Sequence, residues 1–197
     1  MKSLHVNIMR GKMPGLLQTV NRLINGNSSS DSPNLENVYF YYSEIVSQAR
    51  NPVFYERLGV PDTLEGRFDC ISLHMALALI VLKFKSGETN RFSQDLFDLF
   101  FADVDRNLRE IGVGDLSVGR QVKKLASNFY GVLAAYEGCL QNPTLFASAL
   151  ERNLFGAQKA DPLTYILLGA YMQDSVKRLT QVFSTRTKTP IEWPELR

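Results

Sequence analysis

Apolar residues recur along most of this chain at the spacing of an α-helix. Between 92 and 111 the apolar positions are 92, 96, 100, 104, 108 and 111, and most of the charged residues fall off that stripe. A second stripe runs from 118 to 140, with apolar residues at 118, 122, 125, 129, 133 and 136. A period near 3.6 residues predicts amphipathic helices, whereas the apolar residues of a strand alternate with a period of two.

Helix-start signals divide the rest of the chain. Asn34, Asn142 and Asp161 have the position and chemistry of N-cap residues, and a proline follows each of the last two. We therefore expect further helices at 35–50, 52–58, 64–85, 144–155 and 163–183. Strand spacing is not regular anywhere, so we predict an all-α fold, a single-domain bundle of about six to seven helices. The expected divisions are a basic tail at 1–33, a helical domain at 34–183 and a polar tail at 184–197.

The composition is ordinary for a globular protein and disfavours two classes. The chain has 197 residues, of which 45% are hydrophobic and 21% charged, with a formal net charge of +2. That charge is too small to argue for nucleic acid, so we expect no DNA partner. The longest apolar run, at 71–82, is shorter than the roughly 20 residues that span a bilayer. We interpret it as the central, buried helix of the bundle.

The first 30 residues differ from the rest because they carry four basic residues and no acidic one. No continuous apolar stretch follows these charges, which disfavours a secretory signal, whereas the composition is compatible with a mitochondrial presequence. We favour a flexible basic tail, with peripheral contact between residues 1–24 and an anionic membrane.

The chain shows no set of residues for catalysis, metal binding or cofactor binding. Cys70 and His74 are one helical turn apart, but a zinc site needs three or four clustered ligands. We expect a core histidine, and buried, unpaired cysteines at 70 and 139. Gly112 and Gly114 lack the preceding strand and following lysine of a phosphate loop, so they are predicted to end a helix. We therefore expect a protein that is not an enzyme and binds no metal or cofactor.

Charges and glycines gather at two helix junctions, at 54–69 and 107–131. Arg67 and Arg109 each lie where an apolar helix meets a glycine turn, where a guanidinium can bind helix-end carbonyls or a carboxylate such as Asp115. We favour a structural clamp in both places, with direct contact to a partner as the alternative.

The helix at 118–140 has a basic face formed by Arg120, Lys123 and Lys124. A solvated helix face is the favoured interpretation, and binding of an acidic partner or RNA is the alternative. The aspartates at 98, 103 and 105 do not converge on one point, so we expect local pairing with Arg106 and Arg109 instead of a carboxylate site.

Four segments occur in a characteristic order. They are GVPDTLEGRFD at 59–69, QDLFD at 94–98, NLREIGVGD at 107–115, and the stretch from Lys123 and Lys124 through FYG at 129–131 to Tyr136. Together they resemble the ubiquinol–cytochrome c chaperone family, over roughly 42–179. The resemblance implies an all-α, non-enzymatic protein. It also implies that mitochondrial members bind newly made cytochrome b with a small partner protein, near the ribosome, and so help to assemble respiratory complex III.

The N-terminus departs from the mitochondrial members, which are longer there, because this chain reaches the shared core within about forty residues. The departure favours an alphaproteobacterial member that acts in the bacterial cytoplasm or at the cytoplasmic face of the inner membrane. It also leaves open whether the small partner and the ribosome are involved. The basic N-terminus keeps a mitochondrial matrix or inner-membrane location open for a eukaryotic protein.

The resulting hypothesis is an assembly chaperone that holds newly made cytochrome b in an apolar groove beside 107–131. We expect most of the aromatic residues at 39–42, 97, 100, 101 and 129–130 to pack in the core, but some of them should then be exposed. The alternative is a helical adaptor that binds ribosome, RNA or another acidic partner through its basic face. The predicted partner-binding residues are Arg67, Arg109, Asp115, Arg120, Lys123, Lys124, Phe129 and Tyr130.

Overall fold

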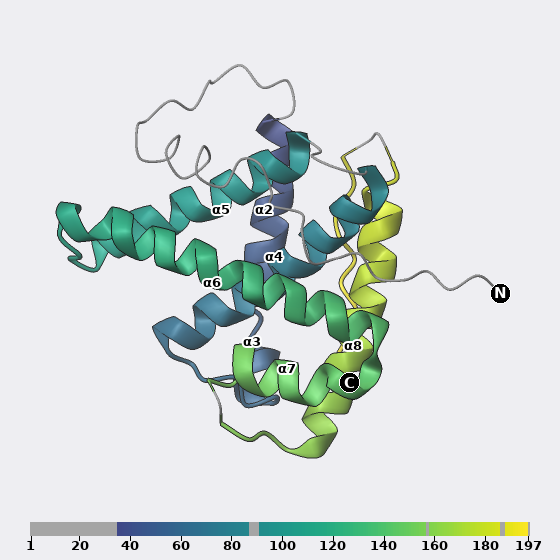
Figure 1. Ribbon diagram of the computed structural model, residues 1–197. Helices are drawn as coiled ribbons and strands as arrows, with labels where there is room; N and C mark the ends of the chain where they lie inside the picture. Colours follow the sequence, from purple (N-terminus) through teal and green to yellow (C-terminus); the bar gives the residue numbers. More distant parts are fainter. Residues whose placement is uncertain (1–34, 87–90, 157, 186–187, 197) are drawn as a thin grey trace.

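The computed structural model describes residues 35–86, 91–156, 158–185 and 188–196 (Figure 1). Every regular element in these ranges is helical, which confirms the all-α prediction. The elements are α2 (Leu35–Ala49), α3 (Pro52–Glu56), α4 (Leu64–Ser86), α5 (Arg91–Glu110), α6 (Asp115–Gln141), the 3-10 helix η1 (Pro143–Leu145), α7 (Phe146–Asn153) and α8 (Pro162–Val182). The predicted cap at Asn34, the tail at 1–33 and the proposed membrane contact at 1–24 lie outside the described residues.

Two predicted N-caps are confirmed. The Asp161 carboxylate accepts from the backbone N–H of Leu163 at 2.7 Å, and the Asn142 side chain accepts from that of Thr144. The turn after Asn142 is a 3-10 helix, so the helix expected at 144–155 becomes regular only at Phe146.

The second amphipathic helix begins earlier than predicted. The predicted start was 118, and the structure begins α6 at Asp115, with Gly114 as its N-cap. Leu116 and Ser117 are exposed, so the first turn carries no core-facing residue from which the apolar pattern could show it. The apolar stripe marks where α6 becomes buried, at Val118, which is three residues after the helix starts.

Helix α4 is the centre of the bundle. It packs against α2, α5, α6 and α8 (Figure 1). Its apolar residues face all sides, and Leu73, Met75 and Leu77 are fully buried. Complete burial of one such side chain stabilises the fold by roughly 1.5–3 kcal/mol relative to exposure. The predicted central helix is therefore confirmed. None of the helices in the described ranges is long and apolar enough to cross a bilayer.

Helices α5 and α6 form an antiparallel hairpin whose outer end extends beyond the rest of the bundle, on the left of Figure 1. Aromatic rings fill the seam between them. The Phe129 ring of α6 lies 5.5–6.0 Å, centroid to centroid, from Phe97, Phe100 and Phe101 of α5. Edge-to-face pairs of this kind stabilise a core beyond their buried area.

The last described segment, 188–196, has no regular structure but packs on the helices. Ile191 is buried, and its backbone N–H donates to the Glu44 carboxylate at 3.2 Å. The ring of Trp193 lies edge-on to His74, 5.2 Å between centroids. This contact with α2 and α4 ties the segment to the bundle. The division of the chain into a domain at 34–183 flanked by two tails stays a prediction.

Candidate functional site

The junction at 107–131 is an elbow between α5 and α6. Helix α5 ends at Glu110, and Gly112 follows with a φ of 89°, a left-handed conformation that side chains with a Cβ disfavour. The backbone N–H groups of Gly112 and Val113 donate to the carbonyls of Arg109 and Leu108, both at 3.0 Å. The predicted role of Gly112 as the end of a helix is confirmed.

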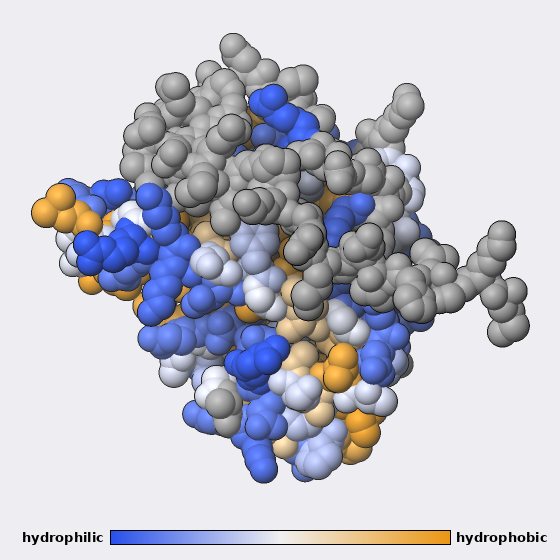
Figure 2. Space-filling view, in the orientation of Figure 1, coloured by the Kyte–Doolittle hydropathy of each residue, from blue (hydrophilic) through white to orange (hydrophobic). Residues whose placement is uncertain are grey.

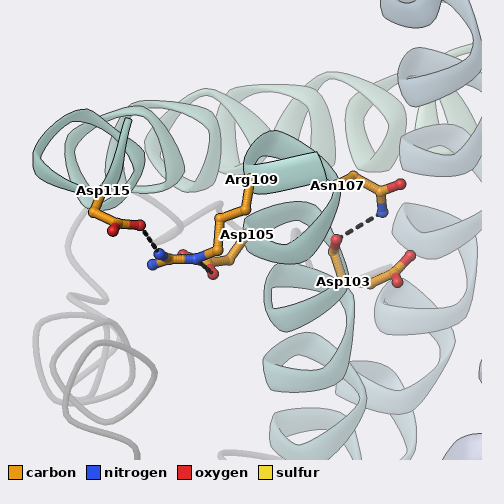
Figure 3. Close-up of polar contacts among 5 residues, drawn as sticks. All are labelled: Asp103, Asp105, Asn107, Arg109 and Asp115. Atoms are coloured by element: carbon orange, nitrogen blue, oxygen red, sulfur yellow. Dashed lines mark hydrogen bonds and ion pairs between the residues drawn. The ribbon is translucent and has the colours of Figure 1, made fainter. Parts of the chain in front are cut away.

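Arg109 holds the two arms of the elbow together (Figure 3). Its Nε donates to the Asp105 carboxylate at 2.6 Å, one turn earlier on α5, and its Nη1 donates to Asp115 at the start of α6. These carboxylates raise the pKa of the Arg109 guanidinium above its ordinary value, the Asp105 hydrogen bond first. Asp115 also lies at the N-terminus of α6, where a negative charge is favourable. The predicted clamp at Arg109 is confirmed.

Asp103 pairs locally with two neighbours on α5, as expected. Asn107 donates its side-chain amide to the Asp103 carbonyl at 2.7 Å (Figure 3), and Arg106 lies 4.0 Å from the Asp103 carboxylate. The Asp103 carboxylate also accepts from the Tyr42 hydroxyl at 2.9 Å. Burial and Asp103 together raise the pKa of Tyr42, so this phenol stays protonated and cross-links α2 to α5.

Arg67 clamps the other junction. Its Nε donates to Asp62 at 2.6 Å, and its guanidinium carbon lies 5.6 Å from the centre of the Tyr55 ring. Gly66 allows the backbones to approach here, because a Cβ at that position would lie 2.0 Å from the Pro61 carbonyl oxygen. The contacts of Arg67 therefore bind α3, the loop and α4 to one another, and the carboxylate they use is Asp62.

The structure separates the predicted partner-binding residues into four groups. Arg109 and Asp115 form the clamp, and Arg67 belongs to the other junction. Arg120, Lys123 and Lys124 lie exposed along α6. Phe129 is buried in the aromatic seam, and Tyr130 is half-buried, with its pKa raised to about 12 chiefly by burial. Of these eight residues, only the basic ones on α6 therefore offer exposed side chains without a partner among the described residues, and partner binding by the eight stays a prediction.

Most of the large exposed apolar residues lie outside the aromatic set in which exposure was expected. Tyr39 is the only clearly exposed member of the aromatic set, at 54%. At the elbow, Ile111 and Leu116 are 56% and 97% exposed. Surface hollows lie elsewhere, one beside Tyr42 and Asp103 and one between the C-terminal half of α8 and the last segment. An apolar groove was expected beside 107–131. In the described residues, the large exposed apolar side chains at this elbow are Ile111 and Leu116, which protrude from the surface.

A second set of exposed apolar residues lies on α8 and was missed by sequence analysis. Leu163, Ile166 and Leu167 are 59%, 67% and 38% exposed, and Leu145 of η1 is 44% exposed. Apolar surface gathers over the lower part of α8 in Figure 2. The signal was present in the segment LTYILLGAYM at 163–172, which has more apolar residues than one buried face of a helix can use.

The interior offers no catalytic chemistry among the described residues. His74 is fully buried, and its pKa is lowered to about 4 by that burial. Cys70 and Cys139 are buried, unpaired thiols whose pKa values are raised by burial to about 12 and about 11. Such thiols are inert, because the thiolate is the reactive form. In the described ranges no three histidine, cysteine or carboxylate side chains cluster to hold a metal.

Comparison with known proteins gives the family. The family model described as ubiquinol-cytochrome C chaperone matches residues 56–186, which include the junction at 107–131, nearly all of the junction at 54–69 and the whole of α8. A solved structure, the crystal structure of the Cbp3 homolog from Brucella abortus, is 36% identical and superposes with a TM-score of 0.67. That likeness covers 85% of this chain and 89% of the other.

Curated relatives agree with the family match. A Xenopus laevis protein named ubiquinol-cytochrome-c reductase complex assembly factor 1 is 26% identical over 127 residues, covering 64% of each chain. A mouse protein of the same name is 26% identical over 140 residues, and the match covers 70% of this chain and 47% of the mouse protein. The match thus spans about half to two thirds of these relatives, which are named as assembly factors and not as enzymes. The chain belongs to the ubiquinol-cytochrome c chaperone family.

Proposed function

We propose that this protein is a non-catalytic assembly chaperone for respiratory complex III, and that its client is newly made cytochrome b. The observation that carries the proposal is the family match over 56–186, because relatives in that family are named as assembly factors of the ubiquinol-cytochrome c reductase complex. A buried, inert interior with exposed apolar side chains supports a binding role over a catalytic one.

The exposed stripe on α8 is the surface best suited to an apolar client. Leu163, Ile166, Leu167 and Ala170 occupy positions i, i+3, i+4 and i+7, so they share one face of the helix, and all four are exposed. No charged residue occurs between 162 and 173. An uncharged, exposed stripe on a helix is the chemistry that packs against another apolar helix. A membrane-protein segment that has not yet reached its partners offers such a helix.

The chain before α7 adds a further exposed apolar side chain. Phe146 packs its ring against Gly169 of α8, where an added Cβ would lie 3.2 Å from the ring. Leu145, which precedes Phe146, is 44% exposed. We call Leu145, Leu163, Ile166 and Leu167 the α8 patch. Because the patch rests on the buried Phe146 and Leu168, its geometry is fixed before a client arrives.

A complementation experiment tests the proposal. Deleting the gene, with no paralogue present, should lower the level of assembled complex III, and the wild-type gene should restore it. Leu163→Glu/Ile166→Glu should fail to restore it, because two carboxylates would have to be desolvated against an apolar client. Both side chains are largely exposed, so the variant should keep its fold and its cellular level.

The matched control places the same two charges elsewhere on the same helix. Thr180→Glu/Gln181→Glu changes two exposed polar residues of α8, and it should restore complex III like the wild type. Unchanged complex III in the deletion strain would remove the proposed function. Full restoration by the α8 patch variant would keep the function but remove this surface from it.

A further inference from the structure

The outer end of the α5–α6 hairpin exposes two large apolar side chains. Leu116, in the first turn of α6, is 97% exposed, and Ile111, just after α5, is 56% exposed. Apolar surface marks this protruding end on the left of Figure 2. An isolated exposed leucine is ordinary on a protein surface, so the residues around it decide whether it has a role.

Three basic residues lie C-terminal to Leu116 on the same side of α6. Arg120, Lys123 and Lys124 follow it at i+4, i+7 and i+8, and all are exposed. No acidic residue occurs between 116 and 136. In the described part of the chain, these three cations have no carboxylate within ion-pair distance.

The acidic residues near the hairpin end do not cancel this charge. Between 105 and 124 there are five basic and three acidic residues, and Asp105 and Asp115 are both bound by Arg109. Glu110 is the third acidic residue. The hairpin end therefore presents two apolar side chains, then three uncompensated cations along one exposed helix face.

We infer that this hairpin end, Ile111 to Lys124, is a peripheral docking site for an anionic lipid bilayer. A bilayer surface has two layers, anionic headgroups outside and acyl chains beneath them. The apolar side chains at the hairpin end suit the acyl chains, and the cations behind them suit the headgroups. Lys123 lies about 10 Å along the helix from Leu116, at 1.5 Å per residue. Interfacial helices bury their apolar side chains by roughly 5–10 Å. With α6 entering steeply, Leu116 reaches the acyl boundary while Lys123 and Lys124 meet the phosphates.

The same face is less suited to RNA. Single-stranded RNA is bound by exposed aromatic rings on which bases stack. The aromatic residues nearest the basic face are Phe129, which is buried, and Tyr130, which is half-buried with its ring 5.6 Å from Phe97. An exposed leucine at the tip has no role in phosphate binding, whereas it is what a bilayer takes up. The inference is independent of the proposed client.

Co-sedimentation of the full chain with lipid vesicles tests the inference. The wild type should bind vesicles of phosphatidylcholine with phosphatidylglycerol, bind phosphatidylcholine alone weakly, and lose binding as salt rises. Ile111→Ser/Leu116→Ser and Lys123→Gln/Lys124→Gln should each lower the partition coefficient on anionic vesicles by about tenfold or more. The matched control, Leu163→Ser/Ile166→Ser, removes two equally exposed apolar residues from the α8 patch and should bind like the wild type.

Three outcomes would overturn the inference. One is a wild type that does not bind anionic vesicles at low salt. Another is unchanged binding by the Ile111/Leu116 variant, which would move any lipid contact to the N-terminal segment. A third is loss with the lysine variant alone, together with displacement of the vesicles by single-stranded RNA, which would indicate a nucleic-acid face. Because no client is present in this assay, its failure leaves the complementation result for complex III unaffected.

Discussion

His74 shows how one buried polar residue is accommodated in an apolar core. Its Nδ1 lies 2.7 Å from the Cys70 carbonyl oxygen, which can only accept, so Nδ1 carries the proton. Nε2 then accepts from the Tyr171 hydroxyl at 2.7 Å, and Tyr171 in turn accepts from Gln48 at 3.0 Å. The neutral ring is thus fully satisfied, which explains why a histidine can lie beneath Phe54 and Trp193.

This arrangement makes stability depend on pH. The His74 pKa is about 4 in the folded state and near 6.5 when unfolded. Between these values the unfolded chain binds the extra proton, so the free energy of unfolding should fall as pH drops through this window. The difference between the two pKa values corresponds to a loss of up to about 3 kcal/mol in the free energy of unfolding. The test is the free energy of unfolding measured by denaturant at several pH values.

The His74→Gln variant should lack the part of the pH dependence that comes from His74. Comparison with this variant is needed because another group changes the free energy of unfolding in the opposite direction. Burial, then Glu65, raises the pKa of Asp69 to about 6, so the folded state binds protons more tightly there and gains stability as pH falls. The difference between wild type and variant isolates His74. Parallel pH profiles for the two proteins would show that His74 does not titrate as described.

At the scale of the elements, the elbow explains why glycine and charge occur together without an active site. Gly112 turns the chain, and Arg109 then binds Asp105 and Asp115 across the turn. The sequence was sufficient to predict the helix end and the clamp, because both depend on neighbouring residues. It was not sufficient to predict that α6 starts at Asp115, because the first turn of that helix carries no core-facing residue. It also could not show which rings Phe129 meets, because packing between the two helices decides that contact.

Two glycines on the same hairpin should respond oppositely to alanine. Gly112→Ala should lower the free energy of unfolding by about 1 kcal/mol, because alanine is strained at a φ of 89°. Gly131 lies exposed inside α6 with nothing within 4 Å of an added Cβ. Gly131→Ala should therefore raise the free energy of unfolding by about 0.5–1 kcal/mol. Denaturant unfolding measures both changes, and a same-sign result would contradict the elbow geometry.

At the scale of the whole molecule, the helical bundle could be predicted from the sequence, but its exposed apolar surface could not. The central α4 and the amphipathic α5 follow from apolar spacing alone. The α8 patch does not, because an apolar residue in a helical pattern is assigned to the core, and only the folded arrangement shows that no described element covers Leu163 and Ile166. The packing of 188–196 was also missed, since a polar segment with two prolines gives no periodic signal.

The last segment should contribute to global stability. Ile191→Ala should lower the free energy of unfolding by about 2 kcal/mol or more, because Ile191 is 5% exposed and leaves a cavity when truncated. Glu192→Ala is the control. The Glu192 side chain is next in sequence to Ile191 but 90% exposed, so removing it should change the free energy of unfolding little. Equal unfolding midpoints for the two variants would show that the segment is not docked.

Capture of newly made cytochrome b tests the central claim most directly. Cytochrome b synthesised in cells carrying a tagged copy of this protein is cross-linked during synthesis and recovered through the tag. The account predicts recovery with the wild type and with Thr180→Glu/Gln181→Glu, and a loss of about tenfold or more with Leu163→Glu/Ile166→Glu. No recovery of cytochrome b with the wild type, or equal recovery with all three proteins, would contradict it.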